Sequence, residues 1–183
     1  MIEMVCSQIQ KWKIQNLRSV PVSDNVSAIQ LRSEDFIEHF KSTTSAFGIE
    51  PHELEVEITE NSLIQERNFP LLKLEELRSI GHKVLLDDFG TGFSSLSYVS
   101  KLPFDTIKVA QEFMRHHSNE QRQIEVILRA IVALATGLQK SLMVEGIETL
   151  DQLKMVKALG FDEYQGYYFS KPLTAEHFEK LLN

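Results

Sequence analysis

Short apolar segments alternate with longer amphipathic ones along the whole chain, and this alternation limits the possible folds more than any other feature of the sequence. The apolar segments have the length and composition of buried strands. We predict six strands, at residues 20–26, 54–58, 83–86, 106–109, 141–144 and 163–165. Strands separated by helices run parallel and are joined by right-handed crossovers. The predicted fold is therefore an α/β sheet that is either doubly wound or closed into a barrel.

The amphipathic segments predict helices before, between and after these strands, with no low-complexity linker to divide the chain into domains. The predicted helices are residues 2–15, 33–47, 60–80, 94–100, 120–136, 150–158 and 175–182. Gly81, Gly137 and Gly160 each follow one of these segments. Glycine is the residue most often found just after a helix, so we predict that these three glycines end their helices.

Composition and charge exclude several classes of protein. The chain has 183 residues, which is enough for one domain with a substantial core, and its net charge is −7. A chain of this charge has no basic surface with which to bind a nucleic acid polymer. Cys6 is the only cysteine, so no disulfide scaffold forms, and no apolar stretch is long enough to predict a membrane segment. We expect a cytoplasmic protein.

A polar or charged side chain stands at or just after the end of every predicted strand. These residues are Asn25, Glu57, Asp87 with Asp88, Lys108, Glu145 and Gln165. The carboxyl ends of parallel strands meet on one face of a barrel, so we expect these side chains to surround one cavity. Taken singly, most of them have a simpler explanation: Asp87 and Asp88 as turn or cap residues, Glu57 at a helix start, and Lys108 as a solvated strand end.

The set as a whole favours a cation site, because carboxylates that share a cavity repel one another unless a cation compensates them. Oxygen ligands without clustered His or Cys indicate Mg²⁺ or Mn²⁺ in preference to zinc. Two such ions, about 3.5 to 4 Å apart, can hold the attacking and leaving oxygens of a phosphate ester. In that chemistry Lys108 is a fixed positive charge and Glu145 a general base.

At these same residues the sequence resembles the EAL-domain family of bacterial cyclic di-GMP phosphodiesterases. The similarity runs from about residue 5 to the end of the chain. The segments that carry it are PVSDNVSAIQL from Pro21, ELEVEITE from Glu53, DDFGTGFSSLSYV from Asp87, LPFDTIKVA from Leu102, VEGIET from Val144 and LGFDEYQGYYFSKPL from Leu159. The DDFGTG and QGY segments, in this order and at this spacing, are highly specific to the family.

The resemblance implies a modified TIM barrel that hydrolyses cyclic di-GMP to linear pGpG with Mg²⁺ or Mn²⁺. It implies that Asn25, Glu57 and Asp87 are metal ligands, that Asp88 lies at the metal site, and that Lys108 and Glu145 serve the attacking water. Glu60 would brace the DDFG loop, which in the family also contributes to dimerisation. Glu148 and Gln165 would support the substrate network.

The chain departs from the family pattern at two places. It contains no Glu-Ala-Leu signature, and the position after Val109, where the family has an aspartate that helps to hold the second metal, is Ala110. A complete (β/α)₈ barrel takes about 250 residues, roughly 70 more than this chain has. We therefore predict that residues 1–183 are a partial EAL domain without its first two βα units, an incomplete TIM-like barrel of about six parallel strands.

These departures predict little or no hydrolysis by the isolated chain. Two alternatives are a non-catalytic module of the family, which binds cyclic di-GMP or a protein, and a remnant that does not fold alone. An open barrel would expose strand edges at residues 20–26 and 163–165. A homodimer or pairing with another EAL chain would cover them.

Overall fold

Six parallel strands form one curled sheet in the computed structural model of the chain, which describes residues 1–65, 70–92, 96–115 and 121–182. The strands are hydrogen-bonded in chain order, from β1 to β6, with every neighbouring pair parallel. Their bounds are β1 Val22–Asn25, β2 Leu54–Thr59, β3 Val84–Phe89, β4 Thr106–Val109, β5 Ser141–Val144 and β6 Glu163–Tyr164. The structure thus confirms six parallel strands, with ends that differ from the prediction by up to three residues.

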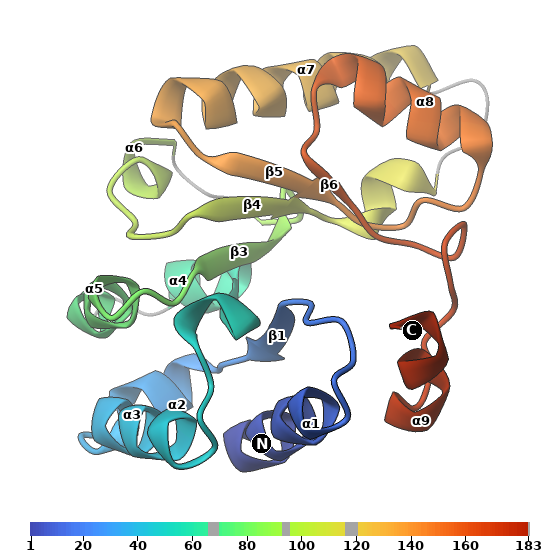
Figure 1. Cartoon of the computed structure of the whole chain (residues 1–183). Coiled ribbons are helices and arrows are strands. Elements are labelled where there is room, and N and C mark those ends of the chain that lie inside the picture. Colours follow the sequence, from blue (N-terminus) through green and yellow to red (C-terminus); the bar gives the residue numbers. More distant parts are fainter. Residues whose placement is uncertain (66–69, 93–95, 116–120, 183) are drawn as a thin grey trace.

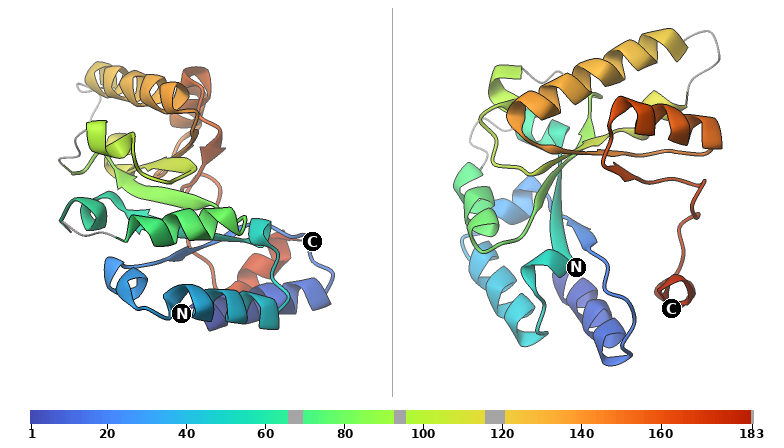
Figure 2. Two further views of the ribbon diagram at one scale, coloured as in Figure 1. Left: turned by 90° about the vertical axis from the view of Figure 1, so that its left-hand side faces the viewer. Right: turned by 45° about the horizontal axis from the view of Figure 1, so that its top comes forward.

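Helices cover the outer face of the curled sheet (Figures 1 and 2). Residues of its inner face line a cavity. The α-helices are α1 Ile2–Ile14, α2 Ala28–Arg32, α3 Phe36–Ala46, α4 Glu60–Gln65, α5 Leu71–Ser79, α6 Leu96–Val99, α7 Gln121–Leu138, α8 Leu150–Leu159 and α9 Ala175–Phe178. Three short 3₁₀ helices are η1 Pro51–Glu53, η2 Gln111–Met114 and η3 Glu179–Leu181.

The core lies between the sheet and the outer helices, and strand alternation explains it. Leu54, Val56 and Ile58 of β2 are at most 1% exposed and belong to this apolar core. Alternate residues of a strand point to opposite faces, so Glu55 and Glu57 point the other way, to the inside of the curl. Both faces are buried, as is usual for a parallel sheet.

Several predicted helix bounds were wrong. The segment 33–47 is a helix only from Phe36, and a separate α2 precedes it, capped by Ser27. The segment 60–80 is two helices, α4 and α5, and Pro70 caps the second; residues 66–69 lie outside the described residues. Proline lacks the N–H that a helix interior needs, so it starts a new helix here.

The ends of three other helices differ from the prediction. Helix α7 continues through Gly137 to Leu138, and the left-handed residue after it is Gln139, so Gly137 does not end the helix. The C-terminal segment is one α-helical turn followed by a 3₁₀ turn. The start of the helix predicted at 94–100 and that of the helix predicted at 120–136 lie outside the described residues.

The two outermost strands, β1 and β6, are not paired with each other, so the barrel is open on one side. Figure 1 shows α9 on this side, at the end of an extended segment and next to α1. Glu179 accepts hydrogen bonds there from Lys11 Nζ at 3.0 Å and Trp12 Nε1 at 3.1 Å, and the ring centroids of Trp12 and Phe178 are 5.6 Å apart. We name these contacts of residues 175–182 with α1 the C-terminal clamp.

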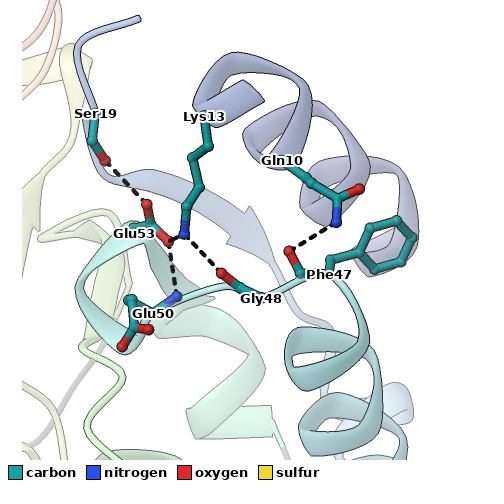
Figure 3. Close-up of polar contacts among 7 residues, drawn as sticks. All are labelled: Gln10, Lys13, Ser19, Phe47, Gly48, Glu50 and Glu53. Atoms are coloured by element: carbon teal, nitrogen blue, oxygen red, sulfur yellow. Dashed lines mark hydrogen bonds and ion pairs between the residues drawn. The ribbon is translucent and has the colours of Figure 1, made fainter. Parts of the chain in front are cut away.

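A second group of polar contacts fixes the other side of α1 (Figure 3). Lys13 Nζ lies 2.8 Å from Glu53 Oε2 and also donates to the Gly48 carbonyl at 2.7 Å. Glu53 Oε2 accepts the Glu50 N–H at 2.8 Å, and Glu53 Oε1 accepts the Ser19 hydroxyl at 3.3 Å. Because each oxygen of this buried carboxylate has a donor, the group holds α1 against the start of β2.

Candidate functional site: the strand-end cavity

Strand register brings the predicted site residues onto one face of the sheet. Asn25 is paired with Glu57, and Lys108 is paired with Met143, two residues before Glu145. Because the side-chain period of a strand is two, these residues all point into the curl. They line one cavity of about 610 Å³ together with Asp87 and Gln165. Six of the predicted site residues therefore share one cavity.

Lys108 lines this cavity and contacts three of its carboxylates, and its side chain is 4% exposed. Its Nζ lies 2.8 Å from Glu57 Oε1, 2.9 Å from Glu145 Oε1 and 3.0 Å from Asp87 Oδ1. Burial by itself lowers the pKa of Lys108, but attraction by Glu57 and hydrogen bonds to Glu57 and Glu145 outweigh burial and place this pKa above its usual value. The ammonium is therefore a permanent positive charge at neutral pH.

One ammonium does not satisfy all the carboxylates around it. Asp87 Oδ1 is buried and, although it lies near Lys108, has no hydrogen-bond partner among the described residues. Single oxygens of Asp87, Asp88 and Glu145 lie within 4.8 Å of one another. A buried acceptor without a donor is costly, and a set of close carboxylate oxygens is the donor set of a hard divalent cation. The residues present thus fit such a cation.

A bulge in β3 explains how two adjacent aspartates reach one place. The pairing of β3 with β4 shifts between Leu86 and Phe89, and Asp88 has a left-handed φ of 55°. In a regular strand Asp87 and Asp88 would point to opposite faces; the bulge turns Asp88 back toward Asp87. Burial and the neighbouring Asp87 and Glu145 raise the pKa of Asp88. The sequence had suggested that the two aspartates follow the strand, but both lie within it.

Glu60 holds the loop that follows these aspartates. Its side chain is buried, and its Oε2 accepts the Gly90 N–H at 2.7 Å. A methyl group on Gly92 would lie 3.1 Å from Glu60 Oε1, so this loop packs closely on the carboxylate. Glu60 is not among the residues that line the cavity, and it contacts the loop beside the cavity.

The remaining predicted residues lie at the rim or outside. Asn25 and Gln165 are exposed, on β1 and directly after β6, at the two edges of the open side. Glu148 is exposed and is not among the residues that line the cavity. Its N–H donates to Gln152 at the start of α8.

Sequence reasoning missed several residues of the cavity wall. Glu55 and Glu163 lie one strand repeat below Glu57 and Gln165, and Met143 lies below Glu145. Counting back two residues from each strand end would have found them. Trp12 and Phe178 form the wall at the open side. No local sequence signal identifies this pair, because it joins the two ends of the chain.

The geometry agrees with a comparison against known protein families. The model of the EAL domain matches residues 1–172. The chain belongs to the EAL-domain family. A relative in Escherichia coli strain K12, the cyclic di-GMP phosphodiesterase PdeR, is 34% identical over 176 residues, which is 96% of this chain and 26% of PdeR. The chain spans about a fifth to a quarter of the length of the curated relatives that it matches.

Solved EAL structures have the same fold. The EAL domain of Mycobacterium smegmatis DcpA superposes with a TM-score of 0.90 at 30% identity, over 98% of this chain and 81% of that one. The PaMucR phosphodiesterase, solved as a cyclic di-GMP complex, superposes with a TM-score of 0.85 at 29% sequence identity. The match covers 97% of this chain and 71% of the PaMucR chain. A calcium and cyclic di-GMP complex of Klebsiella pneumoniae BlrP1 superposes with a TM-score of 0.82 at 25% sequence identity. The match covers 95% of this chain and 44% of the BlrP1 chain. The six strands are thus part of an EAL-type TIM-like barrel.

No helix in the described part of the chain combines the length and apolarity needed to cross a bilayer.

Proposed function

We propose that this chain is an EAL-type cyclic di-GMP phosphodiesterase domain, which opens one phosphodiester bond of cyclic di-GMP to give linear pGpG. The observation that carries this proposal is the buried Lys108 ammonium between three carboxylates, beside a fourth carboxylate, at the mouth of one cavity. A phosphodiester is an anion, which these carboxylates would repel without bound cations. The site is therefore suited to a cation-bridged phosphate ester.

Asn25, Glu57 and Asp87 would hold the cations, with Asp88 beside them. When bound, Mg²⁺ or Mn²⁺ would polarise the phosphate and lower the pKa of a bound water. Glu145, held by Lys108, accepts the proton of the attacking water. The oxygen of that water bonds to phosphorus, one bond from phosphorus to a ribose oxygen breaks, and the ribose oxygen takes up a proton from solvent. Glu60 positions the DDFG loop, and Gln165 and Glu148 belong to the substrate side.

We also propose that residues 1–183 are a partial domain, without the first two βα units of the barrel, and that they hydrolyse slowly or not at all by themselves. Ala110, at the end of β4, is 1% exposed and has no oxygen to offer a cation. Loss of one ligand lowers the affinity for the second ion. The attacking and leaving oxygens are then no longer both bound by a cation.

The test is incubation of the purified chain with cyclic di-GMP and Mn²⁺ or Mg²⁺, with chromatographic detection of pGpG. We expect slow turnover at most, and any turnover should disappear in Glu145→Gln. A matched control is Glu75→Gln at an exposed position of α5, which removes the same charge outside the cavity. Product formation that persists in Glu145→Gln would contradict the proposed mechanism. Turnover at the rate of a complete EAL enzyme would contradict the proposed impairment.

A second candidate function is a non-catalytic module that binds cyclic di-GMP, and Ala110 together with the open side favours it. Calorimetric titration with the nucleotide in the presence of Ca²⁺ tests this candidate. Binding without turnover would support it, and a folded chain that neither binds nor hydrolyses would leave a protein-interaction role.

The unpaired edges of β1 and β6 are the surface on which a homodimer or another EAL chain would dock, and sedimentation of the purified chain tests such pairing. A cytoplasmic location stays a prediction.

A further inference from the structure

A second cavity, of about 380 Å³, lies between β1 and the helices α1, α2 and α3, which Figure 1 shows together in the N-terminal part of the molecule. Asp24 and Val26 line this cavity, whereas Asn25 between them lines the strand-end cavity. Because the side-chain period of a strand is two, Asp24 points away from the carboxylate cluster. The two cavities therefore lie on opposite faces of β1.

Asp24 brings a buried charge to this second cavity. It is only 7% exposed, and its carboxylate forms no hydrogen bond or ion pair in the part of the chain that the structure describes. Met1 also lines the cavity, but its amino group forms no ion pair with Asp24. A buried carboxylate without a partner is unstable as an anion, so it either keeps a proton or receives a cation.

The other residues of the lining suit a small cation with an apolar part. The apolar ones are Ile2, Val26, Phe36 and Phe40. The ring centroids of Phe36 and Phe40 are 6.1 Å apart, and aromatic faces attract cations. Asp35 adds a second carboxylate at the exposed rim, and the lining contains no lysine or arginine among the described residues. Cavities of about 300–1,000 Å³ are the usual size for small-molecule ligands.

A divalent metal ion does not match this lining. Such an ion takes about six oxygen ligands, and Asp24 is not in the group of acidic residues whose oxygens lie close together in the described structure. An organic cation needs only one carboxylate for its charged head, and apolar walls for the rest of the molecule.

We propose that this cavity binds a small organic cation, an alkylammonium or alkylguanidinium, with its charged head on Asp24 and its alkyl part against Phe36 and Phe40. The N–H groups of the head supply the hydrogen bonds that the Asp24 carboxylate lacks, and hydrogen bonds between charged groups are the strong ones. The alkyl part replaces water on the apolar walls. This site does not depend on the proposed phosphodiesterase activity, because it lies on the other face of β1.

An NMR titration of the ¹⁵N-labelled chain with butylammonium and with butylguanidinium tests the proposal, and 1-butanol is the neutral control. We expect at least one of the two cations to shift the amide signals of Val26, Gln30 and Phe36 in a saturable way. The alcohol has the same alkyl part without the charge, so it should bind about 10-fold more weakly or not at all.

Three variants locate the bound cation. Asp24→Asn keeps the shape of the side chain and removes its charge, so the Kd should rise about 10-fold or more. Asp35→Asn makes the same change at the exposed rim and should raise the Kd less than about 5-fold, because solvent screens this charge. Asp87→Asn, in the strand-end cavity, should bind the cation like the parent. If Asp24→Asn failed to fold, the alcohol control and Asp87→Asn would still decide.

Any of four results would overturn the proposal: no saturable shift with either cation, equal affinity for the alcohol, equal weakening in Asp24→Asn and Asp35→Asn, or loss of binding in Asp87→Asn. The first result would mean that Asp24 keeps a proton in place of a ligand, and the last that the cation binds the carboxylate cluster. None of them involves turnover, so formation of pGpG tests the phosphodiesterase proposal separately.

Discussion

Two groups in this molecule, each a lysine paired with a buried carboxylate, look alike but differ in how their charges are satisfied. At Glu53 one carboxylate meets Lys13, a backbone N–H and a hydroxyl, so both of its oxygens have donors. At Lys108 one ammonium meets three carboxylates, and an oxygen of Asp87 has no hydrogen-bond donor in the described structure. The first group is complete without a ligand and serves the fold. The second has surplus acceptors, which is the mark of a cation site.

The largest expected effect is that of Lys108→Met. The substitution leaves Glu57, Asp87 and Glu145 close together without their counter-charge, and breaking a buried ion pair on one side costs about 3–5 kcal/mol of unfolding free energy. Urea denaturation at pH 7 without divalent metal measures it. The side chain of Lys13 is 38% exposed, so Lys13→Met should lower the free energy of unfolding clearly less. Equal losses in the two variants would erase the distinction between the groups.

The second-largest effect is expected from divalent metal, which should stabilise the chain through the Lys108 group and not through the Glu53 group. Mn²⁺ at about 100 times its Kd should raise the unfolding free energy by about 2.7 kcal/mol, because it binds only the folded chain. Asp87→Asn should remove most of this gain, and Glu53→Gln should leave it unchanged. Differential scanning calorimetry with and without Mn²⁺ gives the answer. A gain that survived in Asp87→Asn would mean that the cation binds elsewhere.

Glu53→Gln should lower the free energy of unfolding by about 1–3 kcal/mol, since it weakens charge-assisted hydrogen bonds with Lys13 and the Glu50 N–H. Burial raises the pKa of Glu53, but the contacts with Lys13 and Glu50 outweigh burial and bring it below its usual value. Its stabilisation is thus present above the unfolded-state pKa near 4.5 and lost as pH falls through the folded-state pKa. The deficit of Glu53→Gln should therefore shrink in denaturation curves below about pH 4.5. A deficit that stayed constant on acidification would be the contrary result.

The smallest effect is expected at the exposed C-terminal clamp. Glu179→Gln weakens contacts with Lys11 and Trp12 that solvent screens, so the global unfolding midpoint should hardly move. Amide hydrogen exchange in residues 175–182 should become faster, because this segment is held mainly by α1. Unchanged exchange there would show that the Trp12–Phe178 contact alone holds the clamp.

Much of this architecture could be predicted from local sequence. Apolar segments ending in Glu57, Asp87 and Lys108 indicated the strands and the face on which their ends meet, because alternation and parallel connection are local rules. Helix ends were less predictable. Gly137 looked like a stop, yet α7 passes through it, since a glycine costs a helix interior only about 1 kcal/mol and packing can outweigh that. Glu148 matched the family motif but lies outside the cavity.

The sequence by itself determined which oxygens and which ammonium stand at the strand ends, because side-chain identity and a period of two are properties of the chain. Only the tertiary structure decided that a bulge turns Asp88 beside Asp87, that η2 packs against Gly90 and Gly146, and that Trp12 meets Phe178 across the open side. These arrangements depend on strand register and on the curl of the sheet. Both are set by packing between residues distant in sequence, which no local pattern records.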